Sequence, residues 1–296
     1  MEWTTCIKRA IEFMESDLLA IQGPEEVAEH AYISPMYLQK GFQIMTGFSL
    51  GEYMRSRKLY LAAMDFINTD QKVIDIAFKY GYETPESFTK AFTRFHDATP
   101  SDIRKKILAP KVFLPLKVSI VIQGGNDMDY TVEQKKGFKV IGFVRSFNDE
   151  TSYAEIPKFW DEVKAKYCQN IFAGKEPAGD IEKAIVENEI GEYGICLDDT
   201  GHSGNFRYII GGTYKGGPVP EGMEVVEVPE HLVAHFNCTG PMPGALQAVN
   251  TKIWKEWLPG NSEYELDGNF TIEWYSKGNM GDAGYKTYIE IPVRRK

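Results

Sequence analysis

The sequence predicts two domains of different structural class, an all-α domain followed by an α+β domain. Up to about Lys106 the apolar residues recur with helical spacing, whereas beyond Met128 short alternating segments rich in Gly and aromatic residues take over. Each region also contains an internal duplication. The 296 residues suit two domains. We expect them at 1–107 and 128–296, with a linker at 108–127 that carries Pro110, Pro115 and a turn cluster at 124–127.

Composition and charge exclude several classes of protein. With 43% hydrophobic and 25% charged residues, the chain is neither disordered nor fibrous. No apolar run approaches the ~20 residues of a membrane span, and charged residues interrupt the amino terminus. We therefore expect a cytoplasmic protein without a signal peptide or a membrane partner. The net charge of −9 argues against a chain that coats nucleic acid with its whole surface, and residues 1–110 hold 13 basic against 15 acidic side chains.

The cysteines give no sign of a metal site. Cys6, Cys168, Cys196 and Cys238 lie far apart, with no CxxC pair and no His at ligand spacing. The sequence therefore predicts reduced, mostly buried thiols, no metal and no cofactor.

The amino-terminal region repeats itself with an offset of about 50 residues, because 27–31 aligns with 76–80 and Ser34-Pro35 with Thr84-Pro85. Each copy begins with a short amphipathic helix, expected at 24–31 and 72–80. A tight turn follows, and then a second helix with Ser34 or Thr84 as N-cap and Pro at its first position. This order predicts two helix-turn-helix units.

Each second helix has one apolar stripe that must face the core, so we expect the opposite, polar stripe to be exposed and free to read DNA. Gln39 suits adenine, Lys40 or Lys90 suits guanine, and Met36 suits a thymine methyl group. The predicted DNA-reading residues are Met36, Gln39, Lys40, Gln43, Glu86, Ser87, Thr89, Lys90 and Arg94. Contacts to phosphates are expected from Arg55, Arg57, Lys79, Arg94 and Arg104. For any single Lys or Arg, a solvated helix face is the competing interpretation.

This region resembles the AraC/XylS family of bacterial transcription regulators. The resemblance covers roughly residues 6–106 and is carried by 46–53, 55–58, 76–84, 88–92 and 99–104. It implies a rigid connecting helix at about 50–67 that presents both recognition helices to successive major-groove segments, ~34 Å apart on one face of the duplex. Double-stranded promoter DNA and RNA polymerase are the partners it implies. Because residues 1–110 have a net charge of −2, we expect either a modest non-specific affinity for DNA or acidic residues such as Glu25, Glu26 and Asp65 on the side away from DNA.

The carboxy-terminal region is duplicated too. Residues 139–143 are echoed by 232–236, and a helix follows each, with Trp160 in the first and Trp254 in the second. A pair of strands is expected after each helix. Two strand-helix-strand-strand units predict an α+β domain in which helices cover one face of the sheet and leave the other available for function.

A carboxylate among aromatic residues marks the predicted ligand site. Alternation along 270–275 places Glu273 with Thr271 and Tyr275 on one side, and Phe270, Ile272 and Trp274 on the other. Such a box suits an organic cation, because each good cation–π contact contributes roughly 0.5–2 kcal/mol. The predicted ligand-binding residues are Glu273, Trp160, Tyr193, Tyr208, Trp257, Tyr288 and Glu290. At least one of Trp254 and Trp257 is expected in the core, and an exposed Glu273 or a solvated Glu290 remains an alternative.

This region, about 128–296, resembles the GyrI-like effector-binding domains, which also follow AraC-type helix-turn-helix pairs in Rob-like regulators. The segments that carry the resemblance are 156–160, 193–196, 257–259, 270–273 and 288–293. In cation-binding members, a Glu at the position matching Glu273 is the counter-ion of the ligand. The resemblance therefore implies a small-molecule effector, cationic or aromatic and drug-like.

Together these features predict a ligand-responsive, sequence-specific transcription regulator, with activation as the expected effect. One alternative is a GyrI-like hydrolase with Glu273 as general base. Against it, His202, His231, His235 and Ser203 have no catalytic motif around them. The other alternative is a drug-sequestering protein that does not read DNA.

Overall fold

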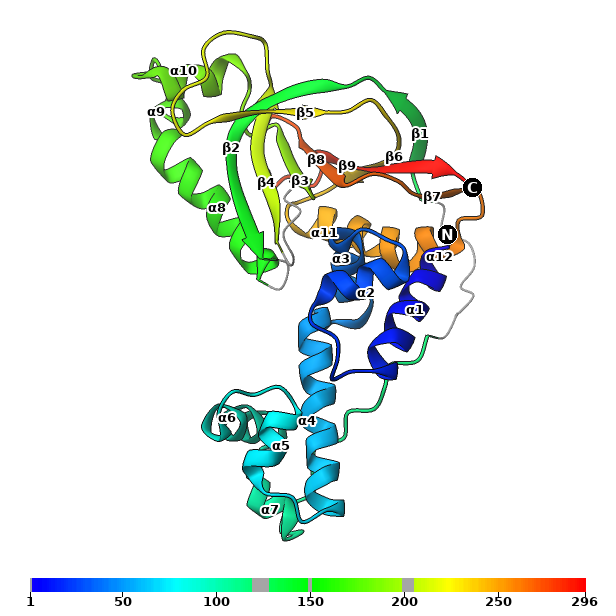
Figure 1. Cartoon of the computed structure of the whole chain (residues 1–296). Coiled ribbons are helices and arrows are strands. Elements are labelled where there is room, and N and C mark those ends of the chain that lie inside the picture. Colours follow the sequence, from blue (N-terminus) through cyan, green and yellow to red (C-terminus); the bar gives the residue numbers. More distant parts are fainter. Residues whose placement is uncertain (1, 119–127, 149–150, 199–204) are drawn as a thin grey trace.

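The computed structural model describes residues 2–118, 128–148, 151–198 and 205–296. Figure 1 shows a helical part, with α1–α7, joined to a large curved sheet that carries further helices. The helices of the first part are α1 Trp3–Ser16, α2 Pro24–Ala31, α3 Pro35–Thr46, α4 Leu50–Asn68, α5 Val73–Lys79, α6 Pro85–His96 and α7 Pro100–Arg104. This agrees with the predicted fold class.

The two predicted helix-turn-helix units are confirmed as α2–α3 and α5–α6, joined by α4. The Ser34 side chain accepts a hydrogen bond from the Tyr37 backbone N–H at 3.3 Å, and Thr84 does the same for Ser87 at 3.1 Å. These caps satisfy N–H groups that have no partner within their own helices. Both second helices therefore begin where the sequence places them.

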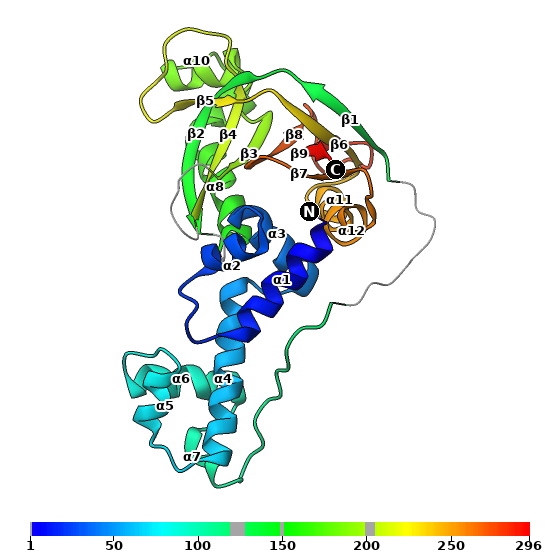
Figure 2. The same cartoon turned by 45° about the vertical axis from the view of Figure 1, so that its right-hand side comes forward.

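The described part of the linker, residues 108–118, has no helix or strand and runs back alongside α4 (Figure 2). Phe113 anchors it, because its ring packs against Phe48 and Phe95 at centroid distances of 5.4 and 6.0 Å. The backbone N–H of Lys111 donates to His96 Nδ1 at 3.1 Å. The turn expected at 124–127 lies outside the described residues.

Two strand-helix-strand-strand units, β2-α8-β3-β4 and β6-α11-β8-β9, form the α+β part. The strands lie in the order β1-β6-β9-β8-β3-β4-β2-β5, with β7 beside β9, so that β3 and β8 join the two units at the centre. The strands are β1 Tyr130–Lys135, β2 Phe138–Asn148, β3 Tyr193–Leu197, β4 Asn205–Thr213, β5 Glu224–Val228, β6 His231–Thr239, β7 Tyr264–Leu266, β8 Phe270–Tyr275 and β9 Lys286–Arg295. The helices are α8 Ser152–Tyr167, α9 Gln169–Phe172, α10 Asp180–Glu187, α11 Gly244–Lys252, the π-helical turn η1 Ile253–Trp257, and α12 Leu258–Gly260.

The division between the hydrophobic cores does not coincide with the boundary between the all-α part and the α+β part. The first helix-turn-helix unit, with α1 and the start of α4, shares one buried cluster with the helices and the inner sheet face of the α+β part. The second unit forms a separate cluster with the rest of α4 and α7. Figure 1 shows this division, with α1–α3 against α11 and α12, and α5–α7 at the far end of α4.

The four cysteines are free thiols, and Cys6, Cys196 and Cys238 are buried. Within the described ranges, no helix combines the length and the apolar character that a bilayer crossing demands.

Candidate functional site

A cavity of about 370 Å³ lies between the sheet, α8, α11 and α3. Glu273 of β8 lies in it with four aromatic side chains, of which Trp160, Tyr208 and Tyr275 carry a polar group. The remaining lining residues are Met36, Gln39, Lys40, Gln43, Ser152, Ile156, Pro157, Asp161, Lys164, Cys196, Phe206, Met242, Pro243, Leu246, Gln247, Asn250 and Met280. The cavity is thus largely apolar and places the carboxylate of Glu273 among aromatic side chains.

Hydrogen bonds hold this box together. Trp160 Nε1 donates to Tyr208 Oη at 3.1 Å, and Tyr275 Oη donates to Glu273 Oε2 at 2.7 Å. Burial and the nearby Glu273 charge raise the pKa values of Tyr208 and Tyr275 well above the ordinary tyrosine value. Both phenols therefore stay neutral, and Glu273 remains the hydrogen-bond acceptor of the group.

Gly194 of β3 makes room for the box. A Cβ atom there would lie 2.1 Å from Tyr208 Oη and 3.4 Å from Glu273 Oε2. Since Gly194 pairs directly with Glu273 across β3 and β8, the missing side chain leaves the space that the Tyr208 hydroxyl fills.

The structure separates the predicted ligand-binding residues into two groups and leaves Trp257 outside both. It brings Trp160, Tyr208 and Glu273 together, whereas Tyr193, Tyr288 and Glu290 line a second cavity of about 250 Å³ on the opposite face of the sheet. The expectation of a single pocket is therefore wrong. The cause is strand register, because Tyr193 and Tyr288 both pair with Trp274, whose side chain points away from the Glu273 face.

Two further expectations about the pocket need correction. The Glu273 cavity lies on the helix-covered face of the sheet rather than on the free face, since α8 and α11 both supply its walls. Trp257 lines neither cavity and belongs to the core, where its ring packs against Phe236 and Tyr130 at 4.9 and 5.3 Å. Trp254 is fully buried as well. Sequence reasoning did not select Tyr275, although its alternation with Glu273 was sufficient to find it.

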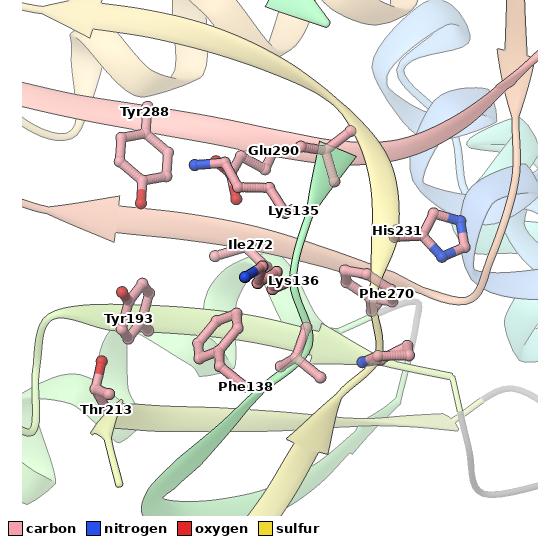
Figure 3. A pocket seen from close by; sticks show the side chains of 13 residues that line it. Lys135, Lys136, Phe138, Tyr193, Thr213, His231, Phe270, Ile272, Tyr288 and Glu290 are labelled. Atoms are coloured by element: carbon pink, nitrogen blue, oxygen red, sulfur yellow. The ribbon is translucent and has the colours of Figure 1, made fainter. Parts of the chain in front are cut away.

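The second cavity holds a cluster of charged side chains (Figure 3). Glu290 is buried, and its Oε1 lies 2.9 Å from His235 Nδ1 and 3.1 Å from Lys135 Nζ. Glu133 lies 3.2 Å from the same ammonium group. Although ligand atoms of Glu133, His235 and Glu290 lie within 4.8 Å of one another, the ammonium group of Lys135 already pairs with both carboxylates. The cluster is an ion-pair network that runs from the buried Glu290 to the half-buried Lys135 and the exposed Glu133.

This network makes stability depend on pH. The hydrogen bond to Glu290 raises the pKa of His235 above its ordinary value of about 6.5. The charged histidine therefore contributes stability below about pH 6.5 that is lost as the pH rises through the folded pKa. We expect the difference in unfolding free energy between wild type and His235→Gln, measured in urea, to shrink between about pH 6 and pH 8. A difference that stays constant over this range would exclude His235 as a pH-sensitive group.

The two helices predicted to read DNA have different surroundings. On α6, Glu86, Ser87, Lys90 and Arg94 are exposed and Thr89 is half-buried, as expected for a reading face. On α3 no residue is exposed, and Met36 and Gln39 keep only 3% and 5% of their accessible surface. The expectation of an exposed stripe is wrong for α3, because the α+β part covers it. Lys40 and Gln43 are half-buried at the Glu273 cavity.

The basic residues predicted to contact phosphates also differ from one another. Arg55 is exposed on α4, whereas Arg57 is buried and bonded to Glu15, with 2.8 Å between Nη2 and Oε2. Lys79 pairs with Asp65 at 2.7 Å, and Arg104 donates to the carbonyl oxygen of Gln71. The expectation for Arg57 is therefore wrong in this arrangement, because an internal carboxylate occupies its guanidinium group.

Both the helical part and the α+β part of the chain match known protein families. Residues 131–293 match the family described as integron-associated effector binding protein, and residues 27–106 match a helix-turn-helix domain family. Regulatory protein SoxS of Salmonella typhimurium is 36% identical over 101 residues, which are 34% of this chain and 94% of SoxS. The HTH-type transcriptional activator AarP of Providencia stuartii is 32% identical over 98 residues, 33% of this chain and 73% of AarP.

Among solved structures, a putative transcription regulation protein from Staphylococcus aureus MU50 is 19% identical with a TM-score of 0.43, covering 57% of this chain and 99% of that one. Because the family matches together span both the helical and the α+β regions, they fix the class of the protein. The chain belongs to the AraC-type helix-turn-helix transcription regulators, with a GyrI-like effector-binding domain of the integron-associated family at its carboxy-terminal end.

Proposed function

We propose that this transcription regulator responds to an aromatic organic cation held in the Glu273 cavity, and that it acts as an activator at promoter DNA. The observation that carries the ligand class is the carboxylate of Glu273 beside the rings of Trp160, Tyr208 and Tyr275. Activation rests on the similarity to AarP, whose name states that role. The exposed face of α6 supports direct DNA reading over mere sequestration of drugs.

The shape of the cavity and the position of Glu273 favour a cation, while the four charged side chains of the lining, Lys40, Asp161, Lys164 and Glu273, sum to zero. Apolar walls from Ile156, Phe206 and Leu246 accept an aromatic body, and Glu273 offers the opposite charge in a partly desolvated setting. The ammonium group of Lys164 already lies 5.5 Å from the centroid of the Trp160 ring. A ligand cation would use the same kind of contact from inside the cavity.

The surroundings of Glu273 favour binding over hydrolysis. A general base needs a nucleophile or a water-activating partner within reach, yet its neighbours Tyr208 and Tyr275 are neutral phenols with raised pKa values. His235 pairs with Glu290, which lines the cavity on the other face of the sheet. His202 and Ser203 lie outside the described residues. Among the described residues that line the cavity, Ser152 and Cys196 have no histidine beside them to act as a base with Glu273.

A titration with two matched compounds tests the ligand class. Naphthylmethyl-trimethylammonium and its neutral tert-butyl analogue differ only in charge, and tryptophan fluorescence reports their binding to the full chain. We expect Glu273→Gln to weaken binding of the cation about 10- to 100-fold, because the counter-ion is lost, and to leave binding of the neutral analogue unchanged.

Glu290→Gln is the matched control, because it removes a carboxylate from the other face of the same sheet. We expect it to retain cation affinity, with folding checked by thermal melting. Equal affinity of wild type for both compounds would contradict the proposed ligand class. Loss of cation binding in Glu290→Gln alone would indicate that the ligand binds in the second cavity.

A further inference from the structure

One wall of the Glu273 cavity comes from the first DNA-reading helix. The α3 residues that line the cavity are Met36, Gln39, Lys40 and Gln43. With the 50-residue offset of the repeat, their counterparts on α6 are Glu86, Thr89, Lys90 and Thr93, which border a shallow, open hollow on the surface. The same four positions therefore face a ligand cavity in one repeat and solvent in the other.

Specific contacts hold α3 against the effector-binding domain. Tyr37 is buried, and its hydroxyl donates to the carbonyl oxygen of Phe270 at 2.8 Å. The Met36 backbone N–H donates to Asp198 Oδ2 at 3.4 Å. The ring of Trp254 packs against Trp3 and Tyr37 at centroid distances of 5.0 and 6.2 Å.

Close packing at Gly41 brings the α3 backbone up to these rings. A Cβ atom at Gly41 would lie 2.2 Å from the ring of Trp3 and 2.6 Å from the ring of Trp254. No larger residue fits between the two tryptophans without displacing one of them. The seam between α3 and η1 is therefore packed as tightly as a domain core.

While α3 is docked, that is, packed against the effector-binding domain, its side chains cannot read DNA. A recognition helix must offer bare side chains to base edges in the major groove. Met36 and Gln39 are buried against the effector-binding domain, so a duplex cannot reach them unless α3 separates from it. The exposed face of α6 has no such restriction.

We propose that the polar face of α3 is shared between two ligands, forming one wall of the effector site when docked and reading DNA when released. An organic cation in the cavity contacts Gln39 and Gln43 as well as Glu273, binds the docked arrangement more tightly, and so weakens DNA binding through the first helix-turn-helix unit. This inference rests on the proposed function, because it takes the Glu273 cavity as the effector site. By linkage, DNA weakens cation binding by the same factor.

The first test asks whether α3 contacts the effector. Binding of naphthylmethyl-trimethylammonium to the full chain is measured for Gln43→Ala and for Thr93→Ala, the matched change on α6. We expect Gln43→Ala to weaken binding about fivefold, which corresponds to the loss of one side-chain contact, and Thr93→Ala to have no effect.

The outcomes separate the two proposals. If Glu273→Gln weakens cation binding but Gln43→Ala does not, the inference that α3 forms part of the effector site is overturned and the proposed function stands. If wild type does not bind the cation at all, the proposed function fails, and so does the inference about α3, which depends on it.

The second test measures coupling to DNA. A duplex is selected from a random pool with the full chain, and its Kd is measured by fluorescence anisotropy with and without saturating cation, with tetramethylammonium at equal ionic strength as control. We expect the naphthyl cation to raise the Kd about tenfold in wild type and not in Glu273→Gln. Tyr37→Phe, which loses the bond to Phe270, should bind DNA more tightly without the cation. A Kd that is unchanged or lowered by the cation in wild type would overturn the inference.

Discussion

Replacing Trp254 with alanine is expected to lower the free energy of unfolding of the full chain by about 3–5 kcal/mol. The side chain is fully buried, its Nε1 donates to Asn250 Oδ1 at 3.2 Å, and its ring contacts Trp3 of α1 and Tyr37 of α3. Removing it leaves a large cavity at the seam between the domains, which the packed neighbours cannot refill. Urea unfolding followed by far-ultraviolet circular dichroism measures the loss.

Trp257→Ala provides the matched control for this prediction. Its ring packs against Phe236 and Tyr130 within the effector-binding domain, so it should cost comparable stability without opening the seam. Cys6 serves as a probe of the contact between α3 and the effector-binding domain, because it is buried and lines the same cavity as Tyr37 and Leu258. We expect an alkylating reagent to label Cys6 faster in Trp254→Ala than in Trp257→Ala. Equal labelling rates would show that Trp254 does not hold α3 in place.

The second large effect is expected for Arg57→Met, which should destabilise the chain by about 3–5 kcal/mol. Arg57 Nε and Nη2 each donate to the Glu15 carboxylate at 2.8 Å, and Nη1 donates to the carbonyl oxygen of Phe113 at 2.6 Å. The substitution leaves Glu15 with one partner of this group, the Tyr53 hydroxyl at 2.7 Å, in a largely buried position. An uncompensated buried charge is the costly outcome.

A double variant separates this cost from lost packing. Glu15→Gln with Arg57→Met removes both charges, so it should recover a large part of the stability that Arg57→Met alone loses. Both variants are compared with wild type by urea unfolding. If the double variant is no more stable than Arg57→Met, the lost stability comes from packing around the aliphatic part of Arg57. It does not then come from the unpaired carboxylate of Glu15.

Local sequence patterns were sufficient for much of the fold. Ser34-Pro35 and Thr84-Pro85 mark helix starts because capping depends on neighbouring residues only, and the structure shows both caps. The alternation that placed Glu273 beside Tyr275 and apart from Trp274 also follows from backbone geometry within one strand.

The errors concern contacts between distant segments. Alternation within β8 does not fix its register against β3 and β9, so the positions of Tyr193 and Glu290 relative to Glu273 could not be predicted. The amphipathic pattern of α3 shows which face meets its own core, but not that another domain covers the polar face. The partner of Arg57 lies 42 residues away in α1, beyond the reach of any helical pattern.

Amide hydrogen exchange of the full chain, with and without naphthylmethyl-trimethylammonium, tests most directly whether α3 forms part of the effector site. We expect saturating cation to slow exchange in α3 and at the β8 residues around Glu273, while α6 exchanges at the same rate in both conditions. Exchange in α3 that is unchanged or faster with the cation bound would show that α3 is not part of the effector site.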